Sequence, residues 1–300
     1  MIVDSTARAL LDIAGYYRSK FDVKVVGVTG SVGKTTTKDM IALVVAQKYK
    51  TLKTQGNHNN EIGMPQTLFG LDSSYEAAVI EMGMSHQGEI SRMSMSCQPD
   101  VAVITNIGIS HIENLGTQEN ILKAKLEILD GAAYDAPLIL CRDDKLLAGV
   151  QLHSDRKVYY YSVSKKDCDV YASGVKTVDN SITFTINYEG GKIAAQINCL
   201  GEHNVKNALA AFCVGLALDI PPEDIVKGIA QFKPEGLRQN VTVIDGVTYI
   251  VDCYNAAPDS MKASLSVLSQ AQAEGKRICV LGDMPVSYTH LRAHETLMNL

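Results

Sequence analysis

The sequence lacks the features that mark several large classes of protein. It contains no tryptophan, and its seven cysteines include no CxxC pair, which excludes a zinc ribbon and indicates reduced thiols in a cytoplasmic protein. Its apolar runs, of which 77–80 is typical, are far shorter than the ~20 residues of a membrane span. Asp4, Arg8 and Asp12 interrupt the N-terminus, where a signal peptide would be apolar. A net charge of −5 gives no basic surface, so we expect a cytoplasmic protein that binds neither nucleic acid nor membrane.

Short apolar runs alternate with helical patterns through the first half of the 300 residues. Four runs predict buried strands, at 24–28, 77–80, 101–104 and 137–140. Helical spacing fills the intervals at 34–49, 88–95 and 118–129. This alternation predicts an α/β fold in which helices flank a mostly parallel sheet. In such sheets ligands bind outside the carboxyl ends of the strands, which is where a functional site is expected.

The pattern changes after residue 150. Between Lys157 and Asn198, alternating residues and turn signals predict a small β-rich subregion of short strands. Helices are expected over 204–218 and 222–231, and a proline and a glycine at 234–236 indicate a boundary. The strand and helix rhythm then resumes, with expected elements at 248–251, 260–273 and 277–281. We therefore expect an N-terminal remnant or linker over 1–22, a central domain over 23–235, the start of a second Rossmann-like domain over 236–284, and a tail over 285–300.

A strand, a glycine turn and a helix follow one another in a phosphate loop at 30–36. Gly30 and Gly33 leave backbone N–H groups free to face phosphate oxygens, and the following helix presents its positive end. Lys34 would reach the β- and γ-phosphates, and the Thr35 hydroxyl would bind Mg²⁺. Val28 stands where the full pattern has its first glycine, and the alternative is an ordinary turn with a solvated lysine. The motif predicts nucleotide binding by Gly30, Ser31, Val32, Gly33, Lys34, Thr35 and Thr36.

Two further side chains are expected at the same edge of the sheet. Glu81 ends an apolar run, and a carboxylate at the end of a strand beside a phosphate loop is suited to hold Mg²⁺. His111 follows the next strand by a short loop, which places an imidazole on the same edge as Lys34. For Glu81 the alternative is a strand-end glutamate exposed to water, and Glu89 is a rival carboxylate for the metal. For His111 the alternative is a surface histidine or a core histidine with its hydrogen bonds satisfied.

Four segments together resemble one family, the Mur ligases. They are 27–38, 56–63, 81–83 and 201–211. The run GNHNNEIG and the segment 252–261 favour the branch of the family that adds D-alanyl-D-alanine. The resemblance extends from about residue 10 to Met284. It implies an ATP-dependent, peptide-bond-forming ligase of peptidoglycan synthesis, a cytoplasmic monomer that acts on UDP-N-acetylmuramoyl-tripeptide and D-alanyl-D-alanine.

The resemblance also implies how the site works. In the family, ATP converts a carboxylate to an acyl phosphate that the acceptor amine attacks, so crowded anions need a lysine and Mg²⁺ to neutralise them. Thr35 and Glu81 would hold one Mg²⁺, and Glu81 and His111 a second. Lys125 matches the lysine that is carbamylated in the family, which requires a lowered pKa and yields a carboxylate beside the metal. From the sequence alone, Lys125 would be a lysine on a helix surface.

Other residues match positions on the nucleotide side and the substrate side. The resemblance implies that Asn204 and Asn207 reach the adenine. It also implies that Arg238 contacts a phosphate and that Asp252 approaches the ribose. The alternatives are an N-cap for Asn204 and a solvated loop position for Arg238. Asn57 and Asn60 are expected to shape the active-site edge, and turn formation is the alternative to substrate contact for both.

The chain also differs from the family pattern. Cys253 and Ala257 stand where serine and asparagine are expected. Family members carry an N-terminal domain for the UDP-sugar, whereas here only 1–22 precede the phosphate-loop strand, and 285–300 do not match. We therefore expect a fragment, truncated at both ends, that keeps nucleotide-binding geometry over 20–235 and ligates poorly or not at all.

Two other functions fit the same motifs. A sibling Mur ligase or a folylpolyglutamate-type ligase would use the same phosphate chemistry with another acceptor. A phosphate-loop nucleotide-binding module without ligase activity would hydrolyse nucleotide slowly without a carboxylate substrate, and His111 and Lys125 would be dispensable in it.

Overall fold

The structure, a computed structural model, describes residues 2–152, 155–178, 180–234, 236–271, 273 and 275–282. The expected tail over 285–300 lies outside the described residues, as do Asp283 and Met284 and, at the expected boundary, Glu235. No helix in these ranges combines the length and the apolar character that crossing a bilayer would require.

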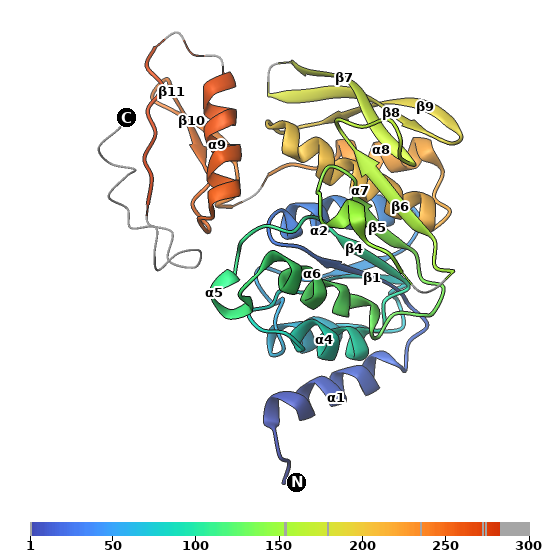
Figure 1. Cartoon of the computed structure of the whole chain (residues 1–300). Helices are drawn as coiled ribbons and strands as arrows, with labels where there is room; N and C mark the ends of the chain where they lie inside the picture. Colours follow the sequence, from blue (N-terminus) through green and yellow to red (C-terminus); the bar gives the residue numbers. More distant parts are fainter. Residues whose placement is uncertain are drawn as a thin grey trace.

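One mostly parallel sheet forms the centre of the fold (Figure 1). Within the described residues it has nine strands in the order β2-β3-β1-β4-β5-β6-β7-β8-β9. Its first six strands in the chain are all parallel to their neighbours: β1 (Lys24–Thr29), β2 (Thr51–Lys53), β3 (Ala77–Glu81), β4 (Val101–Ile104), β5 (Leu138–Cys141) and β6 (Val158–Ser162). Strands β3, β4 and β5 are buried throughout, as apolar runs covered on both faces should be. The predicted α/β class is confirmed.

The β-rich subregion is continuous with this sheet. β7 (Val170–Val178) pairs parallel with β6, and β8 (Ser181–Tyr188) and β9 (Gly191–Ile197) then follow as antiparallel strands. Tyr188 pairs with Gly191 across the tight turn that the glycine pair predicts. The subregion is therefore a wing of the main sheet.

Helices cover both faces of the sheet (Figure 1). α2 (Lys34–Val45), α7 (Glu202–Ala217) and α8 (Pro222–Ala230) pack together on one face. The other face carries α1 (Thr6–Arg18), α4 (Glu89–Cys97) and α6 (Gln118–Leu126), which continues into the 3₁₀ turn η1 (Glu127–Leu129). The shorter elements are α3 (Gly63–Leu68), α5 (Ile112–Leu115) and the 3₁₀ turn η2 (Leu147–Gly149). The sequence pattern did not predict α1, α3, α5 or β2.

The chain after α8 forms a hairpin and a helix. β10 (Asn240–Ile244) and β11 (Val247–Val251) pair antiparallel, and α9 (Pro258–Gln270) follows. Asp245 and Gly246 have φ of 51° and 77°, the left-handed geometry of a two-residue hairpin turn. The strand expected over 277–281 is wrong, because these residues form no strand in the described part of the chain. A strand needs a hydrogen-bonded neighbour, and an apolar run alone does not supply one.

Candidate active site

The carboxyl ends of three adjacent strands meet at one edge of the sheet. In the order β3-β1-β4, Val28 pairs with Glu81 and Thr29 with Ile104. The turn after β1, the end of β3 and the loop after β4 therefore lie side by side. This is the edge at which an α/β sheet binds ligands.

Glycine is required at two positions of the phosphate loop. Gly30 has φ 152° and Gly33 has φ 78°, and a Cβ on Gly30 would overlap the Thr105 hydroxyl. Gly33 directly precedes α2, so the free N–H groups of the first helical turn face this edge. The loop after β4 fixes the backbone: the Val32 N–H donates to Oδ1 of Asn106 at 3.0 Å, and the Thr105 hydroxyl donates to the Val32 carbonyl at 2.8 Å. The sequence pattern did not single out Thr105 or Asn106.

Lys34 folds back over the phosphate loop. Its Nζ donates to the Gly30 carbonyl at 2.9 Å and to the Ser31 carbonyl at 3.4 Å. Burial lowers the pKa of Lys34, while the charge of Glu81 opposes that shift and the charge of Arg238 adds to it. The three charged groups therefore act on one another at this edge.

Glu81 is buried, with 1% of its surface exposed. Its Oε1 accepts a hydrogen bond from Nδ2 of Asn59 at 2.8 Å, and its N–H donates to the Thr54 hydroxyl at 3.0 Å. Among the described residues, Oε2 of Glu81 is the one buried side-chain nitrogen or oxygen without a hydrogen-bond partner. A buried carboxylate oxygen is costly to leave unpaired, so this atom fits a metal ligand.

The asparagines of the loop before α3 have three different environments. Asn59, which the sequence pattern did not single out, is the one that binds Glu81. Asn60 uses its Oδ1 to accept two backbone N–H groups at the start of α3, at 3.1 and 2.8 Å. The side chain of Asn57 is exposed. The double asparagine was the available signal, but its spacing does not tell which amide turns toward the strand end.

Lys125 is buried on α6, with 3% of its surface exposed. Burial and the positive charge of Lys34 lower the pKa of Lys125 well below its ordinary value. Burial lowers the pKa of His111 as well, and the charges of Lys34 and Lys125 add to that shift. Lys34, Lys125 and His111 therefore lie close enough for their charges to act on one another, and Lys34 is the one of the three that the charge of Glu81 also affects.

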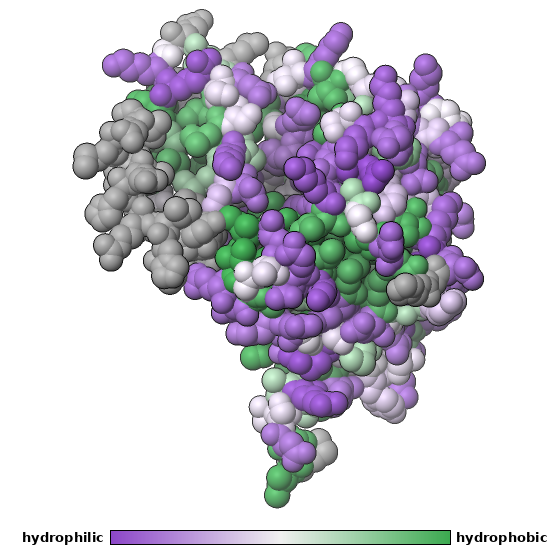
Figure 2. Space-filling model, viewed as in Figure 1, coloured by the Kyte–Doolittle hydropathy of each residue, from purple (hydrophilic) through white to green (hydrophobic). Residues whose placement is uncertain are grey.

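A cleft of about 400 Å³ opens beside the phosphate loop. Its lining includes Val32, Gly33 and Thr36 and four residues expected at the nucleotide: Asn204, Asn207, Arg238 and Asp252. The Arg238 guanidinium lies 4.0 Å from the centre of the Tyr254 ring, and Asp252 accepts a hydrogen bond from the Ser264 hydroxyl. Hydrophilic side chains predominate on the face shown in Figure 2, with apolar side chains visible between them.

The amides of Asn204 and Asn207 bind protein groups. Asn204 donates through Nδ2 to the Leu200 carbonyl at 2.7 Å and to Oε1 of Gln239 at 3.0 Å, and its Oδ1 accepts from Nδ2 of Asn207 at 3.0 Å. The Thr37 hydroxyl donates to Oδ1 of Asn207 at 3.1 Å. The pair therefore links α2, α7 and the segment before β10. A contact with adenine stays a prediction, and it would require these amides to exchange partners.

A Mg²⁺ site at this edge would not be a ready cluster of protein ligands. No three His, Cys, Asp or Glu side chains gather as a metal site in the ranges that the structure describes. Mg²⁺ does not need such a cluster, because it keeps several waters and is held by one or two carboxylates together with phosphate oxygens. The unpaired oxygen of Glu81 fits that kind of site.

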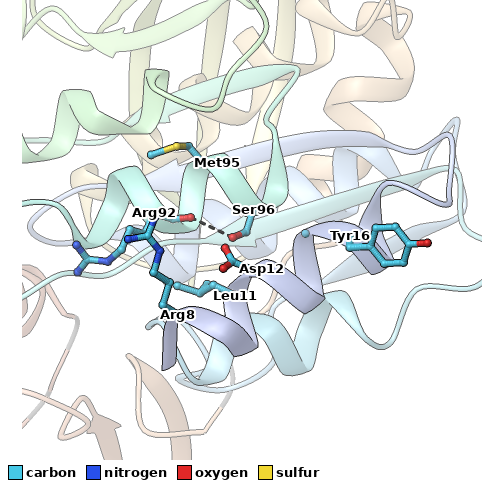
Figure 3. Close-up of a pocket in the computed structure, with 8 residues that line it drawn as sticks. Arg8, Leu11, Asp12, Tyr16, Arg92, Met95 and Ser96 are labelled. Carbon is cyan, nitrogen blue, oxygen red and sulfur yellow. Dashed lines mark hydrogen bonds between the residues drawn. The ribbon is translucent and has the colours of Figure 1, made fainter. Parts of the chain in front are cut away.

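A smaller hollow of about 260 Å³ lies between α1 and α4 (Figure 3). Arg8 and Asp12 of α1 and Arg92 and Met95 of α4 are among the residues that line it. None of the residues that line it belongs to the phosphate loop. This hollow is therefore separate from the strand edge.

Comparisons with known sequences identify two matching family models. The Mur ligase middle domain matches residues 28–215, and the glutamate ligase domain of Mur ligases matches residues 237–292. The UDP-N-acetylmuramoyl-tripeptide–D-alanyl-D-alanine ligase of Bacillus subtilis is 42% identical over 285 residues, which are 95% of this chain and 61% of that protein. The enzyme of the same name from Escherichia coli is 34% identical over 95% of this chain and 63% of its own length. The chain thus spans about three fifths of these relatives.

Solved structures agree with the sequence comparisons. A crystal structure of MurF from Acinetobacter baumannii superposes with a TM-score of 0.86 at 35% identity, over 91% of this chain and 60% of that one. MurF ligase from Thermotoga maritima in complex with ADP superposes with a TM-score of 0.82 at 28% identity, over 90% of this chain and 62% of that one. With a family model that covers more than half of its residues, the chain belongs to the Mur ligase family.

Proposed function

We propose that this chain is the nucleotide-binding part of a cytoplasmic, monomeric ligase that uses ATP to join D-alanyl-D-alanine to UDP-N-acetylmuramoyl-tripeptide. The observation that carries the proposal is the position of the phosphate loop beside the buried carboxylate of Glu81 at one sheet edge, in a chain 42% identical to the Bacillus subtilis ligase. The ADP bound by the Thermotoga maritima relative supports a nucleotide at the phosphate loop.

The reaction has two steps whose charges suit these side chains. A carboxylate oxygen of the tripeptide bonds to the γ-phosphorus of ATP as the bond to the bridging oxygen breaks, which gives an acyl phosphate and ADP. The amine of D-alanyl-D-alanine then bonds to the acyl carbon, phosphate leaves, and the nitrogen loses a proton. Both steps crowd anions, which Lys34 and the N–H groups at the start of α2 stabilise.

Lys125 is suited to carbamylation, because the neutral amine is the form that bonds to CO₂. The new N–C bond and the loss of one proton convert the side chain to an anion. Burial and the neighbouring charge of Lys34 favour the neutral amine. Thr35, Glu81, His111 and the carbamate of Lys125 would hold Mg²⁺, which when bound supplies positive charge to the phosphates.

The first test uses isothermal titration calorimetry to measure the binding of ATP to this chain, with and without Mg²⁺. We expect saturable binding that Lys34→Ala weakens by ~10-fold or more, the effect of losing a charged contact. The control is Lys24→Ala, at the exposed opposite end of β1, which should leave the affinity unchanged. Binding that is absent, or that is indifferent to Lys34→Ala, contradicts the proposed site.

The second test identifies the acceptor by measuring phosphate release. This chain is expected to ligate poorly or not at all, and any release that it does catalyse should require ATP, UDP-N-acetylmuramoyl-tripeptide and D-alanyl-D-alanine together. Release with a different amino acid or with folate and glutamate favours a sibling ligase. Hydrolysis that needs no carboxylate substrate and that Lys125→Ala leaves unchanged favours a nucleotide-binding module.

A further inference from the structure

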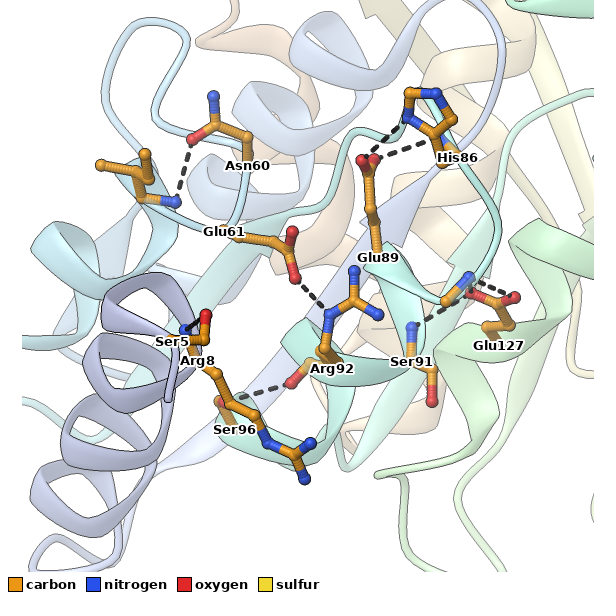
Figure 4. Close-up of polar contacts among 12 residues, drawn as sticks. Ser5, Arg8, Asn60, Glu61, His86, Glu89, Ser91, Arg92, Ser96 and Glu127 are labelled. Atoms are coloured by element: carbon orange, nitrogen blue, oxygen red, sulfur yellow. Dashed lines mark hydrogen bonds and ion pairs between the residues drawn. The ribbon is translucent and has the colours of Figure 1, made fainter. Parts of the chain in front are cut away.

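One carboxylate joins the end of α6 to the start of α4. Glu127 opens η1, two residues after Lys125. Its Oε1 and Oε2 accept the Gly88 N–H at 2.8 and 2.9 Å, and Oε2 also accepts the Ser91 N–H at 3.3 Å (Figure 4). The residue before α4 is a glycine without a capping side chain, so Glu127 supplies the cap from another element.

Gly88 closes the loop that begins at Glu81. Glu89, the first residue of α4, accepts the Ser85 N–H of this loop at 2.6 Å through its Oε2. The same oxygen accepts the His86 N–H at 3.2 Å (Figure 4). The loop is therefore held by β3 at one end and by Glu127 at the other. A movement of η1 would be passed to the segment that follows the Glu81 carboxylate.

A second contact fixes η1 to α4. The Ser94 hydroxyl donates to the Ile128 carbonyl at 2.6 Å and accepts the Gly131 N–H at 3.1 Å. A Cβ on Gly131 would collide with the Ser94 backbone, so the two segments approach as closely as a glycine permits. The segment that directly follows α6 is thus attached to α4 at two points, both of them after Lys125 in the chain.

We propose that Glu127 is a positioning residue that holds Lys125 in place relative to Glu81. The inference rests on the proposed role of Lys125 at the nucleotide site. The Lys125 side chain is buried on α6, two residues before Glu127 on the chain. Its place is therefore set by the backbone of α6 and η1, and Glu127 is the side chain that joins that backbone to the loop after Glu81.

The test compares Glu127→Ala and Glu127→Gln with a matched control, Asp130→Asn. Asp130 is an exposed acid that caps the end of η1 through its backbone, so its substitution removes the same charge without removing an acceptor from α4. Glutamine keeps one oxygen that can accept a backbone N–H, so it should restore most of what alanine loses.

Two readouts separate positioning from general stability. Backbone hydrogen exchange should rise ~10-fold at Gly88 and Ser91 in Glu127→Ala, and it should also rise at Lys125. The ¹³C carbamate signal of the chain equilibrated with ¹³C-bicarbonate should fall several-fold in the folded Glu127→Ala variant and return in Glu127→Gln. Lys125→Arg assigns the signal, and Asp130→Asn should match the wild type in both measurements.

The outcomes distinguish the two proposals. A folded Glu127→Ala protein with wild-type exchange at Lys125 and a wild-type carbamate signal overturns the positioning role. A wild-type chain without any carbamate signal instead contradicts carbamylation, and exchange at Lys125 in Glu127→Ala then decides whether Glu127 positions that lysine.

Discussion

At the scale of single residues, the oxygen of Glu81 that lacks a hydrogen-bond partner is expected to have opposite effects on metal binding and on stability. A buried carboxylate without a full set of partners opposes folding unless a cation compensates for it. The same atom is the one that fits Mg²⁺. A substitution that removes its charge and keeps its shape should therefore act on binding and on stability in opposite directions.

Glu81→Gln tests this directly. The glutamine oxygen can still accept the hydrogen bond from Asn59, so we expect a melting temperature equal to or above that of the wild type. The Mg²⁺-dependent part of ATP affinity should fall by ~10-fold or more. Thermal unfolding and titration with and without Mg²⁺ measure the two effects, with the exposed Glu119→Gln as control. A lower melting temperature together with unchanged affinity contradicts the assignment.

Gly30→Ala tests the phosphate loop. The new Cβ would overlap the Thr105 hydroxyl at a φ that side chains rarely adopt, so we expect a loss of about 2 kcal/mol in the free energy of unfolding. Nucleotide binding should be lost with it. Gly149→Ala is the control, because a Cβ there meets no atom within 4 Å. Urea denaturation that shows equal stability for both variants argues against a strained loop.

At this scale, some residues of the candidate site could be predicted from the sequence and others could not. The phosphate loop and Glu81 could be identified because a strand end and a glycine turn leave a local pattern. Asn59 could not, because three similar amides share one loop and only the folded backbone selects the one that faces Glu81. The burial of Lys125 was likewise invisible locally, since it depends on how α6 packs on α4.

At the scale of elements, buried strands were predicted well and pairing partners were not. The apolar runs of β3 and β4 mark strands that lie in the centre of a sheet, and their limits follow from burial. β2 is a three-residue edge strand with partly exposed residues, so it leaves no such run. The strand expected at 277–281 had the composition of a strand but has no partner among the described residues.

One buried amide joins α2 and α7 by a hydrogen bond. Oδ1 of Asn207 accepts a hydrogen bond from the Thr37 hydroxyl, and its Nδ2 donates one to Oδ1 of Asn204. Asn207 has 8% of its surface exposed. Asn207→Ala should lower the free energy of unfolding by about 1–3 kcal/mol, because it leaves buried partners unsatisfied. A double-mutant cycle with Thr37→Val in urea denaturation should show a coupling of about 1 kcal/mol. Additive effects would mean that the hydrogen bond between the two helices contributes nothing.

At the scale of the whole molecule, two histidines make stability depend on pH. Burial lowers the pKa of His111 and of His203 below the value of about 6.5 in the unfolded chain. The unfolded state then binds more protons than the folded state as the pH falls below that value. The free energy of unfolding should therefore decrease with acidification, by at most about 1.4 kcal/mol per pH unit for each histidine.

His203→Gln should flatten this dependence. Urea denaturation from roughly pH 8 to pH 5 gives the slope, and the exposed His86→Gln is the control. The wild type and the control should lose stability over the same pH range, and His203→Gln should lose less. An identical slope in all three proteins would show that His203 is protonated equally in the folded and unfolded states.

The Lys34 ammonium donates hydrogen bonds to two carbonyl oxygens of its own loop. Any anion that enters must compete with the protein's oxygens for that cation, so entry is an exchange of partners. A lone orthophosphate gains only what remains after those carbonyls are displaced. A polyphosphate would also reach the amides at the start of α2, so we expect the loop to select the longer anion.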